Sequence, residues 1–402
     1  MRIAMVSEHA SPLAVLGGED AGGQNVHVAA LAAGLARRGH DVAVYTRRDG
    51  PDLPEQVEML PRVQVVHVPA GPPEALPKDH LLPYMPEFGR WLARRWADRG
   101  QPDVVHSHFW MSGLAALEAA RSRPVPVVHT YHALGTVKRR HQGAKDTSPP
   151  SRLAAEARIG RDVDLVVATC RDEAEELEAM GVPAASVRIV PCGVDIQQFS
   201  ASGTSRPPRS GHRFRLLSVG RLVERKGVDT VITALPLLPD TELLVAGGPD
   251  QSRIHTDAEA ARLHALAVEL GVADRVRFVG SVPRTQMPAL IRSADVVVAT
   301  PWYEPFGIVP LEAAACARPL VGSAVGGLLD SVADGRTGTL VPPRDPQALA
   351  AALAELLHDP VRRAAYGKAA RDRAEELFSW ERVAAATEAA YTQVHYPKEA
   401  TA

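Results

Sequence analysis

Short apolar runs rich in β-branched residues alternate along this chain with amphipathic stretches rich in Ala and Leu. This alternation constrains the fold more than any other feature, because strands buried on both faces of a parallel sheet have this appearance. Seven such runs occur in the first half, at residues 3–6, 42–45, 63–68, 104–106, 125–129, 165–168 and 187–190. The pattern predicts an α/β fold with doubly wound parallel sheets.

One stretch interrupts the alternation, at residues 200–212, where Pro, Ser, Gly and Arg follow no period. A chain of 402 residues exceeds the size at which one core usually keeps growing. We therefore expect two Rossmann-like domains, residues 1–199 and 213–379, joined by a linker at 200–212 and facing across a cleft. A last helix at about 380–402 is expected to cross back onto the first domain. Strands are predicted in the second half at 215–219, 242–246, 277–279, 296–299 and 320–322.

The composition of the chain argues against several classes of protein, including nucleic-acid-binding, secreted and membrane-spanning proteins. The chain has 45 Lys and Arg against 47 Asp and Glu, a formal net charge of −2, so no overall field attracts nucleic acid or an anionic membrane. Cys170, Cys192 and Cys316 stand far apart without metal-ligand spacing, which favours a reduced compartment and no structural zinc. The apolar start at 1–6 is too short for a signal-peptide core, and no run is long enough to span a bilayer. We expect a cytoplasmic protein.

Ligands of open α/β sheets bind beyond the carboxyl ends of the strands, where four loops carry distinctive residues. The first, 17–25, is rich in glycine and precedes a helix predicted from about Val26 to Arg38. Glycines admit a ligand close to backbone N–H groups, and a helix start suits a phosphate or sugar oxygen. The loop matches neither GxGxxG nor the P-loop pattern, and a plain tight turn is an equal alternative.

The second loop, 220–227, follows the first predicted strand of the second half. Arg221 and Lys226 leave that strand together just before a helix, which suits neutralisation of a diphosphate without metal. A solvated run of charges is the alternative.

The third loop holds two glutamates seven residues apart. Glu304 lies in a loop after a strand, and Glu312 lies about a turn and a half into the following helix. The free amides of that helix start, near Phe306, Gly307 and Ile308, suit a phosphate. Carboxylates repel phosphate, so we expect sugar and ribose hydroxyls as their partners; stabilisation of the helix dipole is the alternative.

The fourth loop closes an apolar strand with His129-Thr130-Tyr131-His132. A lone histidine is usually a hydrogen-bonded core group. His132, however, follows a strand at the expected ligand edge, so we interpret it as a ligand contact.

Together these residues resemble glycosyltransferase family 4 of the GT-B fold, and the resemblance covers nearly the whole chain. The E-x7-E element of Glu304 and Glu312, with an upstream G-R-x4-K, is highly specific in this order and spacing. Segments 20–26, 105–113 and 324–328 look like the D-inositol-3-phosphate glycosyltransferases of mycothiol synthesis within that family. Sucrose-phosphate synthases share the general pattern more distantly.

The resemblance implies a retaining transferase that needs no metal or cofactor and uses a UDP- or GDP-linked sugar. It implies that the second domain binds the nucleotide sugar and the first the acceptor. By this likeness the catalytic group is His132, Arg221, Lys226 and Glu304. The donor would contact Gly23, Arg221, Lys226, Arg284, Glu304, Phe306, Gly307, Ile308 and Glu312. A surface arginine is an equally good interpretation of Arg284.

The acceptor side departs from the resemblance. In the mycothiol enzymes a lysine, a tyrosine, a threonine and an arginine grip the inositol phosphate, and this chain matches only Lys78 and Arg152. Phe109 and Ala133 stand at the tyrosine and threonine positions, so two donors are lost, at roughly 1.5–3 kcal/mol each. We expect another small polar acceptor of a specialised or thiol-related pathway, such as a cyclitol, a sugar, or a thiol or amino-acid derivative. Asn25 is expected to bind an acceptor hydroxyl, and the basic run 138–141 to help hold an anion.

Alternatives are left open. The chain could glycosylate inositol phosphate after all, hydrolyse or epimerise the sugar nucleotide, or bind it without catalysis. The D-x-D string 162–164 precedes a strand and is interpreted as a surface connection. A predicted helix at 88–99 carries four arginines and two tryptophans, which would suit a membrane anchor, although its apolar spacing favours a core-facing helix. No nucleic acid or membrane partner is expected, and a homodimer is left open.

Overall fold

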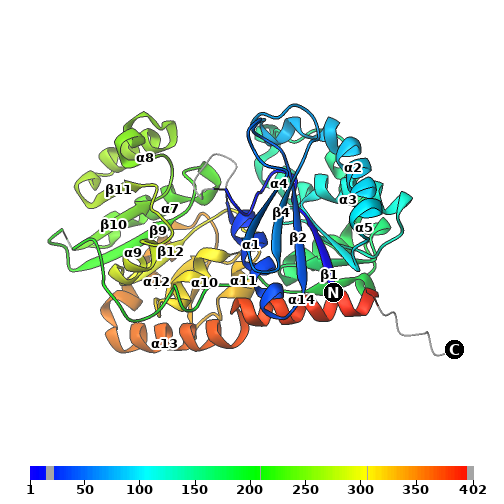
Figure 1. The fold of residues 1–402 in the computed structure, drawn as a ribbon. Helices are drawn as coiled ribbons and strands as arrows, with labels where there is room; N and C mark the ends of the chain where they lie inside the picture. Colours follow the sequence, from blue (N-terminus) through cyan, green and yellow to red (C-terminus); the bar gives the residue numbers. More distant parts are fainter. Residues whose placement is uncertain (15–21, 209, 306, 396–402) are drawn as a thin grey trace. The chain divides into compact units, whose positions relative to one another are not determined.

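The computed structural model describes residues 1–14, 22–208, 210–305 and 307–395 (Figure 1). The chain divides into two compact units. Unit 1 consists of Met1–Cys192 with Trp380–Ala402, and unit 2 of Gly193–Ser379. In the described ranges, no helix is long and apolar enough to cross a membrane.

Unit 1 is built on an eight-stranded sheet in the order β3-β4-β2-β1-β5-β6-β7-β8, in which only β3 runs antiparallel to its neighbour. The chain order reverses beside β1, so the carboxyl ends of β1 and β5 form the switch point of the sheet. The strands are β1 (Arg2–Val6), β2 (Asp41–Arg47), β3 (Gln56–Leu60), β4 (Val63–Val68), β5 (Val104–His108), β6 (Val127–Thr130), β7 (Leu165–Ala168) and β8 (Val187–Ile189).

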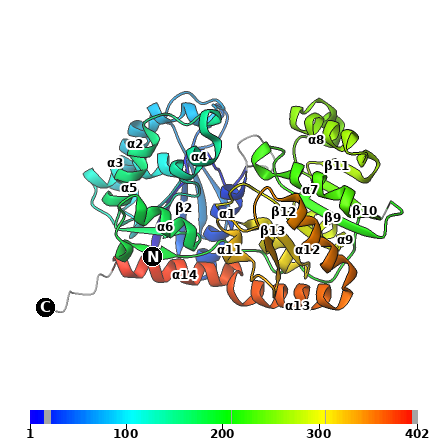
Figure 2. The ribbon, with the colours of Figure 1, turned by 180° about the vertical axis from the view of Figure 1, so that it is seen from behind.

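Helices cover both faces of this sheet (Figures 1 and 2). Successive strand residues point to opposite faces, so Ala4 and Val6 join one core and Ile3 and Met5 the other. The helices are α1 (Gly23–Arg37), α2 (Met85–Arg99), α3 (Trp110–Ser122), α4 (Gly135–Gln142), α5 (Arg152–Asp162), α6 (Arg171–Ala179) and α14 (Trp380–His395), with 3-10 turns η1 (Lys78–His80), η2 (Leu82–Tyr84), η3 (Gly143–Lys145) and η4 (Ala184–Ser186). Helices α2, α3 and α5 pack on the first core, and α1 and α14 on the second.

The apolar face of α2 lies in the protein core. Phe88, Leu92 and Trp96 are buried there, and Arg95 pairs with Glu55. This arrangement matches the core-facing interpretation of the helix rather than a membrane anchor.

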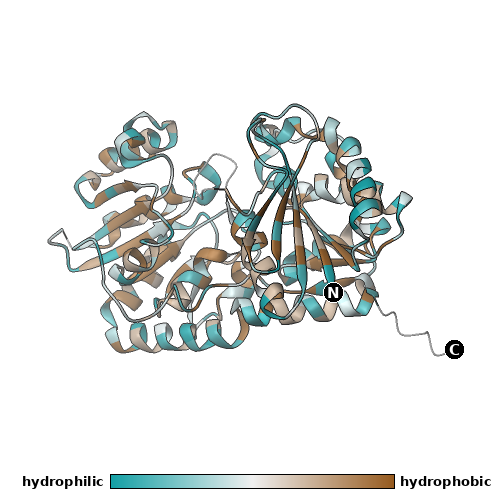
Figure 3. Cartoon of the chain, viewed as in Figure 1, coloured by the Kyte–Doolittle hydropathy of each residue, from teal (hydrophilic) through white to brown (hydrophobic). Residues whose placement is uncertain are grey.

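Unit 2 is built on a six-stranded parallel sheet in the order β11-β10-β9-β12-β13-β14. This is the Rossmann order, with its switch point between β9 and β12. The strands are β9 (Phe214–Val219), β10 (Thr241–Ala246), β11 (Val276–Gly280), β12 (Val296–Ala299), β13 (Leu320–Ser323) and β14 (Gly338–Val341). They carry the hydrophobic residues at the centre of the unit (Figure 3).

The helices that precede β14 connect the strands of unit 2 in turn, and two further helices follow β14. They are α7 (Val228–Ala234), α8 (Ala258–Glu269), α9 (Met287–Ser293), α10 (Ile308–Ala315), α11 (Leu328–Ser331), α12 (Pro346–His358) and α13 (Pro360–Leu377), with 3-10 turns η5 (Glu224–Lys226), η6 (Leu235–Leu237), η7 (Gln251–Thr256) and η8 (Ala273–Arg275).

Part of the stretch 200–212, expected to be the linker between the domains, is hydrogen-bonded to unit 2. Arg292 donates to the carbonyls of Ser200 and Thr204, at 2.9 and 3.0 Å, and the amide of Arg206 donates to Ala289. The first domain was predicted to end at residue 199 and the second to begin at 213. In the structure the boundary lies between Cys192 and Gly193. The Pro- and Ser-rich composition indicated irregular backbone; the described residues here are mostly exposed and held to unit 2 by hydrogen bonds.

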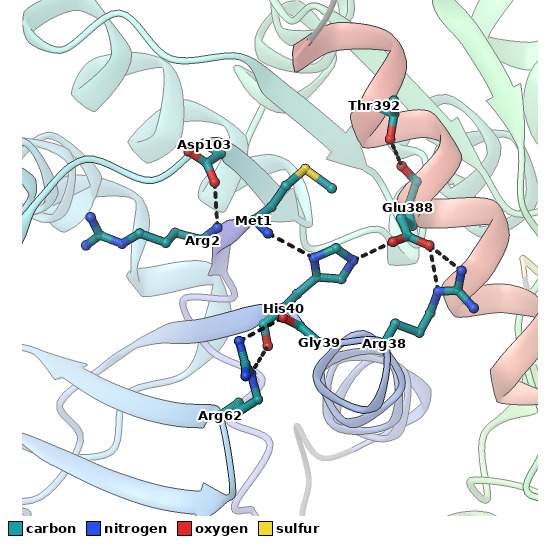
Figure 4. Close-up of polar contacts among 9 residues, drawn as sticks. All are labelled: Met1, Arg2, Arg38, Gly39, His40, Arg62, Asp103, Glu388 and Thr392. Carbon is teal, nitrogen blue, oxygen red and sulfur yellow. Dashed lines mark hydrogen bonds and ion pairs between the residues drawn. The ribbon is translucent and has the colours of Figure 1, made fainter.

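Helix α14 packs closely on α1 in unit 1. A Cβ placed on Gly34 would lie 2.8 Å from the Cβ of Ala384, so the glycine permits the approach. A polar cluster closes the contact (Figure 4): Glu388 accepts from the Arg38 Nε at 2.6 Å and contacts the His40 Nε2 at 2.8 Å. A helix was predicted at about 380–402. The structure has α14 at Trp380–His395, and residues 396–402 lie outside the described ranges.

This cluster makes a contribution to stability that depends on pH. Burial pushes the pKa of Glu388 up, but hydrogen bonds and charges from Arg38 and His40 hold it below its usual value. A carboxylate with a lowered folded pKa stabilises fully above its unfolded pKa, about 4.5, and loses that contribution as pH falls through the folded value.

We expect Glu388→Gln to lower the free energy of unfolding by about 1 kcal/mol at pH 7, measured by urea denaturation. The deficit relative to the unmodified chain should shrink below about pH 4.5. Glu381→Gln, at an exposed position of the same helix, is the matched control. Equal losses in both variants at pH 7 would contradict the role of the cluster.

Candidate active site

A pocket in unit 2 lies at the carboxyl ends of β9, β10 and β12, beside the switch point of the sheet. Its lining includes Gly220, Arg221, Lys226, Thr300 and Glu304. The structure therefore brings three residues of the predicted catalytic group, from two separate loops, to one place at the edge where α/β folds bind ligands.

Glycines fix the backbone around this pocket. Gly227 has φ +65°, and a Cβ there would lie 2.0 Å from the Thr300 carbonyl, so only glycine fits beside Lys226. A Cβ on Gly326, which has φ +47°, would lie 2.4 Å from the Glu304 carbonyl oxygen, and the Gly327 amide donates to that carbonyl at 2.7 Å. The glycine pair at 326–327 thus holds the loop that carries Glu304.

Four of the residues predicted to bind the nucleotide sugar form two ion pairs with one another. The Lys226 ammonium donates to Glu304, and burial lowers the pKa of Lys226 while Glu304 opposes that shift. The Arg284 guanidinium lies 2.6 Å from Glu312, whose pKa burial raises and Arg284 lowers. Arg284 therefore belongs to the same cluster as Glu312 rather than to a solvated surface. Glu304 and Glu312 thus each accept a hydrogen bond from a positively charged side chain.

The helix start predicted to bind phosphate is α10. Gly307 caps it with φ +74°, and Ile308 is its first residue. The amides of this first turn have no partner within the helix. Phe306, predicted as a donor contact, lies outside the described residues.

His132 belongs to a cluster of buried imidazoles in unit 1. It follows β6 with φ +64°, and its Nε2 lies 2.9 Å from the Nδ1 of His108. Burial lowers the pKa of His132 well below its usual value, and the neighbouring histidines lower it further. His132 is therefore a neutral hydrogen-bonding group at physiological pH and not a cation for phosphate.

Four of the five residues expected on the acceptor side lie together. The Lys78 ammonium and the Arg152 guanidinium lie over the Phe109 ring, 5.9 and 5.2 Å from its centre. Arg152 also donates to the Ala133 carbonyl at 2.6 Å. Residues from four segments of the chain thus form one group beside the ends of β5 and β6.

Much of the positive charge here is compensated. The Arg152 Nε lies 2.7 Å from Glu156, and both side chains are buried. Lys138 pairs with Asp146 at 2.9 Å, and Arg140 pairs with Glu176. The basic run 138–141 was expected to help hold an anion, but two of its charges are committed to carboxylates.

Asn25, expected to bind an acceptor hydroxyl, is hydrogen-bonded within unit 1. Its Oδ1 accepts from the Gly22 amide at 3.0 Å, and its Nδ2 donates to the Ser11 carbonyl at 2.9 Å, so the side chain fixes the start of α1. Helix α1 begins at Gly23, three residues before the predicted start. Of the glycine-rich loop 17–25, residues 17–21 lie outside the described ranges.

Glu8 and His9, which directly follow β1, were not among the predicted site residues. Glu8 is buried, its Oε1 lies 2.7 Å from the His9 Nδ1, and its Oε2 accepts from the Ser112 hydroxyl. The His9 ring meets the Phe109 ring edge-on, with centres 5.0 Å apart. The rule that pointed to the other four loops, polar residues after a buried strand, applies here as well.

The D-x-D string is structural. Asp164 accepts from the Val127 amide at 2.8 Å, and Asp162 pairs with Arg158 at the end of α5. In the part of the chain that the structure describes, no group of three or more His, Cys, Asp or Glu side chains is arranged to hold a metal ion.

Comparison with known proteins extends these observations. Residues 21–198 match the family model of Glycosyltransferase Family 4, and residues 205–373 match that of Glycosyl transferases group 1. A D-inositol 3-phosphate glycosyltransferase of Kribbella flavida is 40% identical over 97% of this chain and 95% of its own length. The chain belongs to glycosyltransferase family 4.

Solved structures agree on the fold of this family 4 glycosyltransferase. Sucrose-phosphate synthase from Thermosynechococcus elongatus is 34% identical, with a TM-score of 0.90 over 99% of this chain and all of that one. HepE of Anabaena, in complex with UDP, is 19% identical with a TM-score of 0.74 over 98% of this chain and all of that one. The fold is GT-B, as the sequence predicted, and the protein is a glycosyltransferase.

Lys226→Ala should slow glycosyl transfer by about 10²–10³-fold, because it removes a charge that would stabilise a departing diphosphate. The release of nucleoside diphosphate from the donor measures this rate. Lys368→Ala, at an exposed lysine of α13 paired with Asp372, is the control and should retain full activity. A Lys226→Ala enzyme with normal turnover and a normal unfolding curve would remove Lys226 from the site.

Proposed function

We propose that this enzyme transfers a glycosyl group from a UDP- or GDP-linked sugar to a small hydroxylated anion, with retention of the anomeric configuration and without a metal. The observation that carries the proposal is the pocket at the switch point of unit 2. There, a cation for a diphosphate, Lys226, is already paired with a carboxylate for hydroxyls, Glu304. Arg284 and Glu312 form a second such pair in the same unit.

Donor binding on this proposal is an exchange of partners. The diphosphate replaces Glu304 as the partner of Lys226. Arg221 binds the same diphosphate and helps to neutralise its negative charge. Glu304 then accepts from hydroxyls of the donor sugar, and Glu312 from those of the ribose. Breaking a buried ion pair costs several kcal/mol unless a new partner arrives, so a ligand with both an anion and hydroxyls is favoured.

The transfer step is a same-face displacement. The bond between the anomeric carbon and the diphosphate oxygen breaks, and the acceptor oxygen bonds to the same face of that carbon. The acceptor proton passes to the departing diphosphate. Arg221, Lys226 and the α10 amides stabilise the charge that develops there, and the neutral His132 holds the donor sugar by a hydrogen bond.

Lys78 and Arg152 supply the positive charge on the acceptor side. Because Glu156 compensates Arg152, and Phe109 and Ala133 offer no side-chain donor, an anion smaller or less charged than a phosphate monoester fits best. A carboxylate of a hydroxylated acid or of a thiol or amino-acid derivative meets this description. The pathway proposed is accordingly specialised or thiol-related.

Inositol phosphate is the second candidate acceptor. The grouping of Lys78 and Arg152 around Phe109 favours it, together with relatives such as the D-inositol 3-phosphate glycosyltransferase 2 of Catenulispora acidiphila, 38% identical over 98% of this chain and 95% of its own length. The two candidates differ in whether the unmodified pocket accepts a phosphate monoester.

We expect 1L-myo-inositol 1-phosphate to be a poor acceptor for the unmodified enzyme. Phe109→Tyr combined with Ala133→Thr should raise kcat/KM for it by about tenfold or more, because two hydrogen-bond donors to the phosphate are restored. Steady-state transfer kinetics, with glucuronate as the reference carboxylate, provide the measurement. Efficient transfer to inositol phosphate by the unmodified chain would establish the second candidate instead.

A further inference from the structure

A cavity of about 280 Å³ opens on the sheet of unit 1, at the amino-terminal ends of β1, β2 and β4. The candidate site residues of this unit follow the carboxyl ends of the strands, so the cavity lies at the opposite edge of the sheet. Liquid water takes about 30 Å³ per molecule, and small-molecule sites begin at about 300 Å³. The cavity is therefore large enough for a small organic molecule, and no step of the proposed reaction uses it.

Strand register builds the floor of this cavity. Ala4, Ala43 and Gln64 lie side by side on three neighbouring strands and share one face of the sheet. Helices usually cover both faces of a parallel sheet, but α2 ends at Arg99. The methyl groups of the two alanines are too small to fill the space beyond the helix end. Ala4 and Ala43, called here the alanine floor, thus give the cavity an apolar base.

Charged side chains border the alanine floor at the ends of the strands. Arg2 pairs in register with Asp41, whose Oδ1 lies 3.1 Å from the Arg62 Nη2. Arg62 also donates to the Gly39 carbonyl at 2.8 Å, which fixes its guanidinium (Figure 4). These three charged residues line the cavity, and two cations against one carboxylate give its border a net positive charge.

The Arg2 guanidinium is held in place at the end of α2. Its Nη2 donates to the carbonyls of Arg99 and Gly100, at 3.0 and 2.9 Å. A Cβ on Gly100 would lie 2.4 Å from the Arg2 Nη1, so the glycine makes room for the guanidinium. An arginine has five donor hydrogens and accepts none, so the hydrogens that these carbonyls do not use suit an anion.

A tyrosine hydroxyl lies at the inner end of the cavity. The Tyr45 ring meets the rings of Trp91 and Trp96 edge-on, with centres 6.3 and 6.4 Å apart. Burial raises the pKa of Tyr45, and Trp96 and Arg2 each oppose that shift, so both groups lie near the hydroxyl. The Trp96 N–H completes no hydrogen bond within the described residues. Because an indole N–H can only donate, the Tyr45 hydroxyl must direct its own hydrogen elsewhere.

The cavity thus combines an apolar floor with donors from Arg2 and Tyr45. We propose that it binds a small aromatic carboxylate, whose oxygens accept hydrogen bonds from Arg2 and Tyr45 and whose ring lies on the alanine floor. One negative charge matches the net charge of the border. A sugar or an inorganic anion would leave the alanine floor uncovered, whereas an aromatic ring buries a large flat area. The site does not rest on the proposed function.

The first test is the binding of 4-fluorobenzoate to the full chain, measured by fluorine NMR and by calorimetry. We expect a dissociation constant of about 1 mM or lower. The neutral 4-fluorobenzamide has the same shape and should bind about tenfold or more weakly, because it lacks the charge. Proton NOEs from the ring to the methyl groups of Ala4 and Ala43 would place the ligand on the alanine floor.

The second test fills the cavity or removes a donor. Ala43→Leu should weaken binding about tenfold or more, because the larger side chain occupies the position of the ring. Ala261→Leu, the same change at an exposed position of α8 in unit 2, is the matched control and should leave the affinity unchanged. Tyr45→Phe keeps the ring and should weaken binding about three- to tenfold, the effect of one hydrogen bond. It serves if Ala43→Leu fails to fold.

Lys78→Ala distinguishes this cavity from the acceptor-side group, which also carries positive charge. It should leave the affinity for 4-fluorobenzoate unchanged. Loss of binding in Lys78→Ala would place the carboxylate on the acceptor side and overturn the proposal. Absence of binding to the unmodified chain, equal affinity for the acid and the amide, or unchanged affinity in Ala43→Leu and Tyr45→Phe would overturn it as well.

Discussion

The site depends on parallel strand pairing, because parallel strands bring all their carboxyl ends to one edge of a sheet. In each unit the chain order reverses beside the first strand, β1 in one and β9 in the other. The loops that leave on either side of that point diverge and leave room for a ligand. Lys226 and Glu304 meet in this way although 78 residues separate them, and His9 meets Phe109 by the same geometry.

Charge compensation is the second recurring feature. Lys226 with Glu304, Arg284 with Glu312, and Arg152 with Glu156 are each largely buried pairs. A charge removed from water without a partner is costly, so these pairs allow each unit to bury charged side chains before any substrate arrives. On the proposed function the same pairs impose selectivity, since a ligand must supply a partner for every charge it displaces. A nucleotide sugar carries both an anion and hydroxyls and meets this requirement on the donor side.

The sequence predicted those strands that appear as a continuous run of apolar residues. Strands buried on both faces, such as β4 and β12, were placed to the residue. The edge strand β3 was missed because it pairs antiparallel and is half exposed, so its residues do not form an apolar run. Strand β14 was missed because it begins with Gly and Thr, so only its last two residues are strongly apolar.

Side-chain pairing was less accessible from the sequence. The motifs identified Lys226, Glu304 and Glu312, but no spacing rule shows that Arg284 pairs with Glu312 or that Asn25 caps α1. The position of Glu8 after a buried strand could have been noticed in the sequence, but its contact with Ser112, 104 residues away, forms only in the folded sheet. Tertiary contacts of this kind decide which polar residues are structural and which face a ligand.

The anomeric configuration of the first product tests the central claim most directly. Proton NMR would follow transfer from a UDP-linked α-sugar to the anion that the enzyme glycosylates fastest, in the presence of a metal chelator. A diphosphate held by Arg221, Lys226 and helix amides predicts an α-linked product formed at an undiminished rate. A β-linked product, or turnover that stops with chelator and returns with a divalent cation, would contradict the account.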